Sequence, residues 1–327
     1  MKKVDIKMGY SCNNDCIHCV IQDFKDACIA SGRPVDLTTE EYEREMEESR
    51  EKGCDFIVFT GGEPTMRKDL LYLLRRARDL GYSIQMQTNG RKFSDLNFAR
   101  KMVSIAPIQV CIALHGPNAE IHDAISRRPG SFDETVAGIK NLVSLGRPPA
   151  VKAVISRLNC NSLPDFARYA ISLGANYISL TYPHGCGNAR KYYLEIAPTY
   201  TEVAPRVMEA LKIIRQYNIR ADTEAIPFCF LPGFEEYPCE IPQGEIRGTL
   251  LKQYGDIHRE RNWDIERKEM KIKFPQCHDC KYDLVCEGPW REYPEHYGSD
   301  EFRPVPGEKI KNFTELGLYL QSRKNQA

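Results

Sequence analysis

Short apolar runs alternate with amphipathic stretches along the first two thirds of the chain. The apolar runs have the length of single buried strands and span residues 4–8, 56–60, 83–87, 108–114, 150–156 and 177–182. The stretches between them carry apolar residues at helical spacing and span residues 38–52, 68–80, 95–104, 132–145, 162–173 and 199–217. Thr38 and Glu41 predict a capping box at the start of the first of these helices.

Six alternations of strand and helix predict an α/β fold with parallel strands and right-handed crossovers. Because six units fall short of a complete barrel of this type, they indicate a partial (βα)6 TIM-type barrel. An open doubly wound sheet is the alternative that periodicity leaves open. The pattern ends near residue 220, and the remainder is rich in proline, cysteine and aromatic residues. We therefore predict a barrel over residues 1–220 and a smaller cysteine-rich domain over residues 221–327.

Charge and apolar content exclude several classes of protein. Lys and Arg together number 45, as do Asp and Glu, so no net charge favours nucleic acid or an anionic membrane. The start of the chain lacks the apolar region of a signal peptide, and no apolar run approaches membrane-spanning length. We expect a cytoplasmic protein with no nucleic-acid or membrane partner. Its 13 cysteines are then metal ligands or catalytic thiols where they cluster, rather than disulfides.

The first cysteine cluster directly follows the first predicted strand. Cys12, Cys16 and Cys19 lie in CNNDCIHC, and three thiolates on one short loop can bind three irons of a cubane and leave the fourth open. Zinc is the alternative metal, but a structural zinc ion needs a fourth ligand. His18 adjoins Cys19, so we expect its side chain to point away from the cluster.

This motif resembles the CxxxCxxC signature of the radical S-adenosylmethionine (SAM) superfamily. FTGGEP (Phe59 to Pro64) and QTNG (Gln87 to Gly90) resemble two further motifs of that family, and the resemblance covers roughly the first 220 residues. It implies a [4Fe–4S] cluster whose open iron binds SAM. It also implies reductive cleavage of SAM to a 5′-deoxyadenosyl radical, which takes a hydrogen atom from the substrate. A reducing partner such as flavodoxin or ferredoxin would supply the electron.

The resemblance also suggests which residues contact SAM. Two glycines allow close approach of the backbone, and the Glu63 carboxylate suits the SAM ammonium group. ALHGPN carries Ala113 where relatives have a serine that contacts the ribose. His115 is the candidate substitute there, and a surface histidine with no such role is the alternative. Arg127 or Arg128 is expected to bind the SAM carboxylate in a bidentate manner. The full set of predicted SAM-binding residues is Gly61, Gly62, Glu63, Pro64, Thr88, Asn89, His115, Arg127, Arg128 and Asn159.

A second cysteine cluster lies near the end of the chain. Its members are Cys277, Cys280 and Cys286 in CHDCKYDLVC, a pattern typical of metal ligands that also fits a zinc ribbon. It resembles the SPASM and twitch extensions that follow radical SAM barrels and carry auxiliary clusters. Trp290 occupies the position where a full SPASM pattern has a further cysteine. We therefore expect one auxiliary [4Fe–4S] cluster. Its fourth ligand is Cys229 or Cys239, and Cys229 is favoured because it precedes a Pro-Gly turn just after the barrel.

Two enzymatic functions compete. One is oxidation or epimerisation of a small molecule such as a sugar, an aminocyclitol, a nucleoside or a pterin-like metabolite. The other is modification of a peptide to give a thioether, an epimer or a crosslink. Enzymes of the second kind often begin with a peptide-recognition domain, and the 11 residues before Cys12 do not predict one. A more distant alternative is a non-catalytic iron–sulfur or zinc protein, against which GGEP and the strand–helix units argue.

Cys186 is a candidate catalytic residue. It lies in YPHGCGN, just after the sixth predicted strand, between Gly185 and Gly187. This position falls at the catalytic face of a barrel, and little side-chain bulk shields the thiol. An S–H group there can donate a hydrogen atom to a substrate radical, which would make the protein an epimerase. A small buried cysteine that fills a loop is the alternative.

Overall fold

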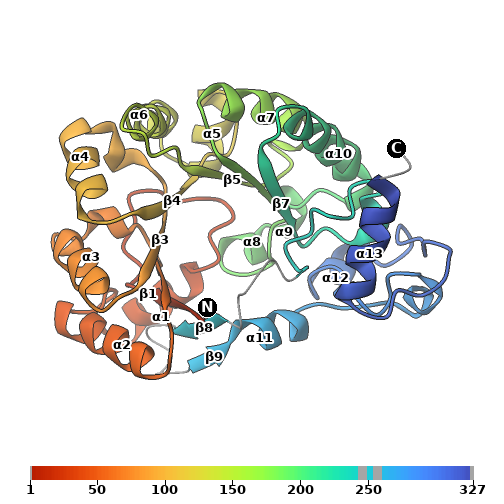
Figure 1. The fold of residues 1–327 in the computed structure, drawn as a ribbon, viewed down its shortest axis with the longest axis horizontal. Helices are drawn as coiled ribbons and strands as arrows, with labels where there is room; N and C mark the ends of the chain where they lie inside the picture. The colour runs from red at the N-terminus through yellow and green to blue at the C-terminus, as the bar shows by residue number, and fades with distance from the viewer. Residues whose placement is uncertain (1, 242–248, 253–259, 325–327) are drawn as a thin grey trace.

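The computed structural model describes residues 2–241, 249–252 and 260–324. Figure 1 shows one curved sheet surrounded by helices, with the C-terminal residues at one side. The strands are β1 (Lys3–Lys7), β2 (Phe56–Thr60), β3 (Ser83–Thr88), β4 (Ile108–Ala113), β5 (Ala150–Val154), β6 (Tyr177–Thr181), β7 (Arg220–Glu224), β8 (Thr249–Lys252) and β9 (Glu260–Asn262).

The sheet follows the order of the chain. Its strand order is β7-β6-β5-β4-β3-β2-β1-β8-β9, and all neighbours are parallel except β8 and β9. A doubly wound sheet reverses its strand order at a switch point, and this sheet has no such reversal between β1 and β7. The doubly wound alternative is therefore wrong. Since β7 and β9 are the two ends of the sheet within the described residues, the barrel is partial, as predicted.

The larger helices of the barrel lie on the outside of the sheet (Figure 1). The six predicted helices correspond to α2, α3, α4, α6, α7 and α10, and the capping box of Thr38 and Glu41 is confirmed. The longer helices are α1 (Gln22–Ala30), α2 (Thr39–Glu51), α3 (Leu70–Asp79), α4 (Leu96–Ile105), α5 (Ala119–Ser126), α6 (Ser131–Ser144), α7 (Leu163–Ser172), α10 (Tyr200–Gln216) and α13 (Phe313–Lys324). The shorter ones are α8 (Asn188–Lys191), α9 (Tyr193–Ile196), α11 (Trp263–Glu269), α12 (Tyr293–Tyr297), η1 (Pro64–Met66), η2 (Arg91–Ser94), η3 (Cys160–Ser162), η4 (Phe228–Phe230) and η5 (Pro275–Asp279).

The two faces of the sheet differ in polarity. Val4 and Ile6 of β1 are fully buried beneath the helices, whereas Asp5 alternates with them and faces the interior of the barrel. On the same inner face Lys152 of β5 forms an ion pair with Glu224 of β7, with 3.0 Å between Nζ and Oε2. The hydrophobic core thus lies between sheet and helices, and the interior of the barrel carries charges.

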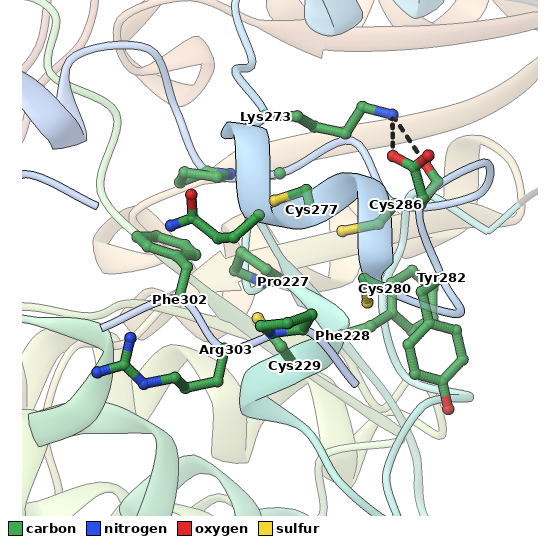
Figure 2. A pocket seen from close by; sticks show the side chains of 15 residues that line it. Pro227, Phe228, Cys229, Lys273, Cys277, Cys280, Tyr282, Cys286, Phe302 and Arg303 are labelled. Carbon is green, nitrogen blue, oxygen red and sulfur yellow. Dashed lines mark hydrogen bonds and ion pairs between the residues drawn. The ribbon is translucent and has the colours of Figure 1, made fainter. Parts of the chain in front are cut away.

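The residues beyond β7 pack on the barrel. β8 pairs with β1, and Trp290, Tyr293 and Phe302 share one hydrophobic core with residues of the barrel. The loops of this region surround a cavity lined by four cysteines (Figure 2). The predicted boundary at residue 220 remains a prediction. Among the described residues, no helix is both long and apolar enough to cross a membrane.

Candidate functional site

The first cysteine loop lies between β1 and α1 and is fixed by backbone contacts. The backbone N–H groups of Tyr10 and Ser11 both donate to Asp36 Oδ1 at 3.0 Å. Further along, the Ile17 N–H donates to the Ile125 carbonyl at 3.0 Å, and the Asn188 side chain donates to the Cys16 carbonyl at 2.9 Å. Contacts from three parts of the chain therefore fix the backbone that carries the cysteines.

The three thiols of this loop are close enough to influence one another. Burial, with a smaller contribution from the charges of Glu63 and Cys19, raises the pKa of Cys12 to about 11. Burial and the neighbouring Cys19 and Cys12 likewise raise the pKa of Cys16. Buried thiols that repel each other as thiolates need a bound cation to become ligands, and binding releases their protons. The loop has the properties of a metal-binding loop.

The GGEP turn after β2 touches this loop directly. The Gly62 N–H donates to the Gly9 carbonyl at 2.8 Å, and the Glu63 N–H donates to the Ser11 carbonyl at 2.7 Å. A Cβ atom on Gly62 would lie 2.0 Å from the Ser11 oxygen, so only glycine fits there. The two motifs were inferred separately, and the fold brings them together.

The Glu63 carboxylate is buried and already holds four hydrogen bonds. Oε1 accepts from the Thr65 N–H at 3.0 Å and from the hydroxyls of Thr65 and Thr88, both at 2.6 Å. Oε2 accepts from the Asn89 N–H at 2.7 Å. Burial raises the pKa of Glu63, and these hydrogen bonds oppose the rise. The carboxylate thus joins the GGEP turn to the TNG turn that ends β3, while Pro64 begins η1 beside it.

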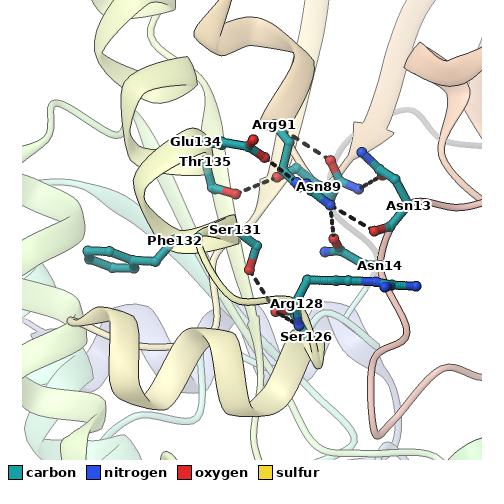
Figure 3. A network of polar contacts seen from close by, with 12 residues as sticks. Asn13, Asn14, Asn89, Arg91, Ser126, Arg128, Ser131, Phe132, Glu134 and Thr135 are labelled. Carbon is teal, nitrogen blue, oxygen red and sulfur yellow. Dashed lines mark hydrogen bonds and ion pairs between the residues drawn. The ribbon is translucent and has the colours of Figure 1, made fainter.

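Asn89 and Arg91 connect the TNG turn to the cysteine loop (Figure 3). Asn89 Nδ2 donates to Asn13 Oδ1 at 2.6 Å. The Arg91 guanidinium donates to the Asn13 carbonyl at 2.7 Å and to Asn14 Oδ1 at 2.9 Å, and it pairs with Glu134. Arg91 is not among the residues that the sequence predicts for the site. Its position directly after TNG was the only signal.

Histidines lie beside the Cys16 thiol, contrary to the expected orientation of His18. A ring nitrogen of His18, one of His115 and Cys16 Sγ all lie within 4.8 Å of one another. Burial lowers the pKa of His18 to about 4, so its imidazole is neutral at pH 7. His18 Nδ1 is buried with no hydrogen-bond partner among the described residues. An unpaired buried nitrogen is costly, which favours a bound ligand at this point.

The remaining predicted SAM contacts divide into buried and exposed residues. Asn159 is buried, and its side chain donates to the carbonyls of His115 at 2.8 Å and Val154 at 2.9 Å. Its amide hydrogens therefore fix the turns after β4 and β5. Arg127 and Arg128 follow α5 and are exposed, and Arg127 lies 3.8 Å from Asp15 of the cysteine loop.

Four cysteines converge in the C-terminal region. Figure 2 shows the sulfur atoms of Cys229, Cys277, Cys280 and Cys286 around one cavity, whose empty volume is about 420 Å³ including open solvent. Burial raises the pKa of Cys229, and the charges of the other three thiols add to the rise. The cavity thus brings four thiols together.

Cys239 has different neighbours. Burial raises the pKa of Cys239, and the charges of Glu240, Glu224 and Asp222 raise it further, the last two from β7. Its backbone N–H donates to the Thr223 carbonyl at 2.7 Å. The geometry therefore groups Cys229, and not Cys239, with the second cysteine cluster.

The spacing of the thiols favours clusters over single ions. Throughout the described ranges, only two groups of three potential ligands have their atoms within 4.8 Å of one another: Cys16 with His18 and His115, and His184 with Cys186 and Glu292. A tetrahedral zinc site of cysteines would draw its sulfurs to within roughly 4 Å of each other. Both cysteine sets are wider than that, as ligands spread over several irons are.

Cys186 lies in the loop after β6, as predicted. Its Sγ is 3.6 Å from His184 Nε2, which is 3.3 Å from Glu292 Oε1. The next two residues contact the first cysteine loop, since the Asn188 N–H donates to the Cys19 carbonyl at 3.0 Å. Cys186 is partly exposed there.

Comparison with known proteins agrees with the motifs and the fold described above. Residues 6–158 match the model of the radical SAM superfamily. The AdoMet-dependent heme synthases of Oleidesulfovibrio alaskensis and Methanosarcina barkeri are 27% and 28% identical, over 85% of this chain and 79% and 87% of theirs. Mycofactocin maturase MftC of Mycolicibacterium smegmatis is 30% identical over 59% of this chain and 47% of its own.

Solved structures share the fold at low identity. Streptococcus suis SuiB bound to S-adenosylmethionine superposes with a TM-score of 0.63 at 15% identity, over 92% of this chain and 76% of SuiB. anSMEcpe with bound AdoMet and a peptide gives 0.65 at 15% identity, over 99% and 100% of the two chains. With the matched domain, the cysteine loop and the partial barrel in agreement, this chain contains a radical SAM domain and shares with these solved structures a partial barrel followed by a C-terminal extension.

Proposed function

We propose that this radical SAM enzyme oxidises a small molecule. Cys12, Cys16 and Cys19 would bind the [4Fe–4S] cluster that holds SAM, and Cys229, Cys277, Cys280 and Cys286 would bind the auxiliary cluster. Together, the first cluster and SAM supply reductive cleavage and hydrogen abstraction. The observation that carries the proposal is the set of four converging thiols around one cavity. A cluster with four thiolates has no open iron, so it supplies electron transfer rather than substrate binding.

The predicted SAM-binding residues fall into two roles under this proposal. Glu63 and Asn159 would position the turns around SAM, because their polar atoms are already engaged by the protein. Gly61, Gly62, Pro64, Thr88 and Asn89 would form the turns themselves. His115, with Arg127 and Arg128, would contact SAM directly. The exposed guanidinium groups suit its carboxylate.

The choice of a small molecule rests on how far each relative extends. The heme synthases align with 85% of the chain, which is more than the barrel alone comprises. The peptide maturase MftC aligns with 59%. The charged inner face, with Lys152 and Glu224, suits a polar metabolite. SuiB and anSMEcpe support only the fold, and peptide modification remains the alternative.

Epimerisation is a second candidate reaction, favoured by one observation. The Cys186 thiol is partly exposed in a loop that contacts the SAM-cluster loop. An S–H group there would return a hydrogen atom to the substrate radical. In heavy water an epimerase would place deuterium in the product and would need Cys186. An oxidation would place no deuterium in the product and would not need the Cys186 thiol.

Anaerobic SAM cleavage tests the proposal. The reconstituted enzyme with a chemical reductant should form 5′-deoxyadenosine, and a filtered cell extract that contains the substrate should stimulate it. Stimulation that survives protease treatment of the extract supports a small molecule. Stimulation abolished by protease supports the peptide alternative, and protein that purifies anaerobically with zinc in both cysteine sets contradicts the whole proposal.

A further inference from the structure

His184, Cys186 and Glu292 form a compact group outside both cysteine clusters. We propose that these three side chains bind one divalent metal ion of the zinc class and leave one coordination position open for a donor group of the substrate. His184 and Cys186 come from the loop after β6, and Glu292 directly precedes α12. The metal-binding step does not depend on the proposed function.

The distances fit a single ion. His184 Nε2 lies 3.6 Å from Cys186 Sγ and 3.3 Å from Glu292 Oε1, and the three ligand atoms lie within 4.8 Å of one another. Zinc binds sulfur at roughly 2.3 Å, and imidazole nitrogen and carboxylate oxygen at roughly 2.0–2.2 Å, so tetrahedral ligands are separated by roughly 3.3–3.6 Å. The two measured separations have these values without any adjustment of the side chains.

Hydrogen bonding alone leaves this group incompletely satisfied. Both Cys186 Sγ and Glu292 Oε1 approach the same ring nitrogen, His184 Nε2. That nitrogen offers either one N–H or one lone pair in the ring plane, so it cannot make a well-directed bond to both partners. Glu292 Oε2 is also buried, with no hydrogen-bond partner in the part of the chain that the structure describes. A cation between the three groups would satisfy all of them.

The surrounding residues hold the ligands in place. The His184 ring stacks on Trp290, with 4.1 Å between the ring centroids and 24° between the planes. A Cβ atom on Gly185 would lie 2.9 Å from the Glu292 side chain, so the β6 loop and the segment before α12 are in contact. Ligands fixed by their neighbours lose little freedom when a metal binds.

The site is open and lies next to the first cysteine loop. The side chains of His184 and Glu292 are 15% and 26% exposed, so a further ligand can reach the metal. The Asn188 N–H, two residues after Cys186, donates to the Cys19 carbonyl. Three protein ligands and an open position are typical of catalytic rather than structural zinc. One neutral imidazole, one thiolate and one carboxylate together balance the charge of a divalent ion. The resulting complex is neutral, which suits binding of a carboxylate or amine of the substrate.

Metal binding at this site bears on the reaction. A metal-bound Cys186 is a thiolate and has no S–H hydrogen to donate. Occupancy by a metal therefore argues against epimerisation and gives Cys186 and His184 the task of holding the substrate beside the radical source. The loop after β6 would position one end of the substrate. The polar interior of the barrel would position the other end.

The test is a metal titration of the holoprotein with both iron–sulfur clusters in place. After chelator treatment that leaves the clusters intact, Zn²⁺ should bind at one ion per chain in competition with a chromophoric chelator. Co²⁺ in its place should give a thiolate-to-cobalt charge-transfer band. His184→Ala and Cys186→Ser should weaken zinc binding roughly 10- to 100-fold or more, and the cobalt band should vanish in Cys186→Ser. Glu292→Gln should weaken zinc binding and keep the band.

Matched controls are available in the chain. Cys160→Ser removes a buried thiol outside the group, and His296→Ala removes a histidine that stacks on Tyr193. Both should bind zinc as the parent does. Iron content and cluster absorbance verify that each variant is folded. A holoprotein that binds no zinc ion, or a Cys186→Ser variant with undiminished affinity, overturns the proposal, and either result leaves the SAM-cleavage assay untouched.

Discussion

Two carboxylates, Glu63 and Glu224, differ in what compensates their burial. Glu63 accepts four hydrogen bonds from neutral groups, whereas Glu224 pairs with the Lys152 ammonium. Burial acts to raise the pKa of Glu224, but the charge and the hydrogen bond of Lys152, together with Lys271 and Thr181, outweigh it and lower the pKa to about 2. At the scale of single residues, one carboxylate therefore organises turns and the other stabilises the barrel interior.

Replacing Glu63 by glutamine should weaken SAM binding. The glutamine NH₂ group would face one of the donors that the carboxylate now accepts, which disturbs the GGEP and TNG turns. Loss of charged hydrogen bonds costs about 1.5–3 kcal/mol, or roughly a 10- to 100-fold rise in the SAM dissociation constant. Anaerobic equilibrium binding measures this. Iron content should stay at the parent level, and unchanged SAM affinity would show that the turn does not depend on this carboxylate.

Replacing Glu224 by glutamine should destabilise the protein through Lys152. Because the pair is partly exposed, the expected loss is about 1–3 kcal/mol, seen as a lower thermal midpoint at pH 7. The folded pKa is depressed, so the contribution is fully present above the unfolded value of about 4.5 and is lost as the pH falls towards 2. The midpoint difference should therefore be constant between pH 6 and 8.

The double variant Glu224→Gln/Lys152→Met provides the control for this pair. It removes both charges, so much of the lost stability should return. A double variant less stable than Glu224→Gln would mean that Lys152 acts through other contacts.

The sequence could identify residues of the site but not their tasks. GGEP pointed to Glu63, but its partners Thr88 and Asn89 belong to another strand end. His18 was expected to point away because it adjoins Cys19, and the fold instead places it beside Cys16 and His115. Such contacts depend on the three-dimensional arrangement of strands, which local spacing does not encode.

At the scale of elements, apolar strands were predictable and polar ones were not. β2 is buried along its whole length, and its sequence FIVFT is unmistakable. β7 has the sequence RADTE and presents Asp222 and Glu224 to the interior of the barrel, so it lacks an apolar signal. β8 has only four residues and joins the sheet beside β1, far from it in sequence. Strands without an apolar run, such as β7, are therefore the ones that sequence patterns miss.

The loop between β6 and α8 should not tolerate a side chain at Gly187. This residue has φ 59° and ψ −129°, and a Cβ atom there would lie 2.1 Å from the Cys19 carbonyl oxygen. Gly187→Ala should displace the first cysteine loop, lower the iron bound there and leave the auxiliary cluster intact. Iron analysis and electron paramagnetic resonance before and after SAM addition would report this.

Gly146→Ala is the matched control for this loop. Gly146 also has a positive φ, 70°, but a Cβ atom there meets nothing within 4 Å. Its replacement should cost about 1 kcal/mol of stability and leave both clusters in place. Equal cluster loss in the two variants would mean that backbone strain, and not contact with the cysteine loop, is responsible.

At the scale of the whole molecule, the C-terminal region and the barrel share contacts. Trp290 Nε1 donates to the Tyr182 carbonyl at 3.4 Å, and Tyr293 and Phe302 pack against Tyr200 of α10. The two sets of cysteines nevertheless lie on different segments of the backbone. In the second set, Cys229 lies in η4, just after β7. One cysteine from the segment just after β7 and three from the last quarter of the chain thus line the second cavity.

This arrangement predicts that Cys229→Ala affects one cluster only. The parent should hold roughly eight irons as two cubanes, and the variant roughly four to seven, with an altered auxiliary spectrum. The first cluster should keep its change in electron paramagnetic resonance on SAM addition, because its loop receives no contact from η4 among the described hydrogen bonds. Cys239→Ala is the matched control, since that thiol lies among Glu224, Asp222 and Glu240, and it should retain both spectra. An auxiliary spectrum altered by Cys239→Ala and unchanged by Cys229→Ala would reassign the fourth ligand and with it the part of the chain that closes the site.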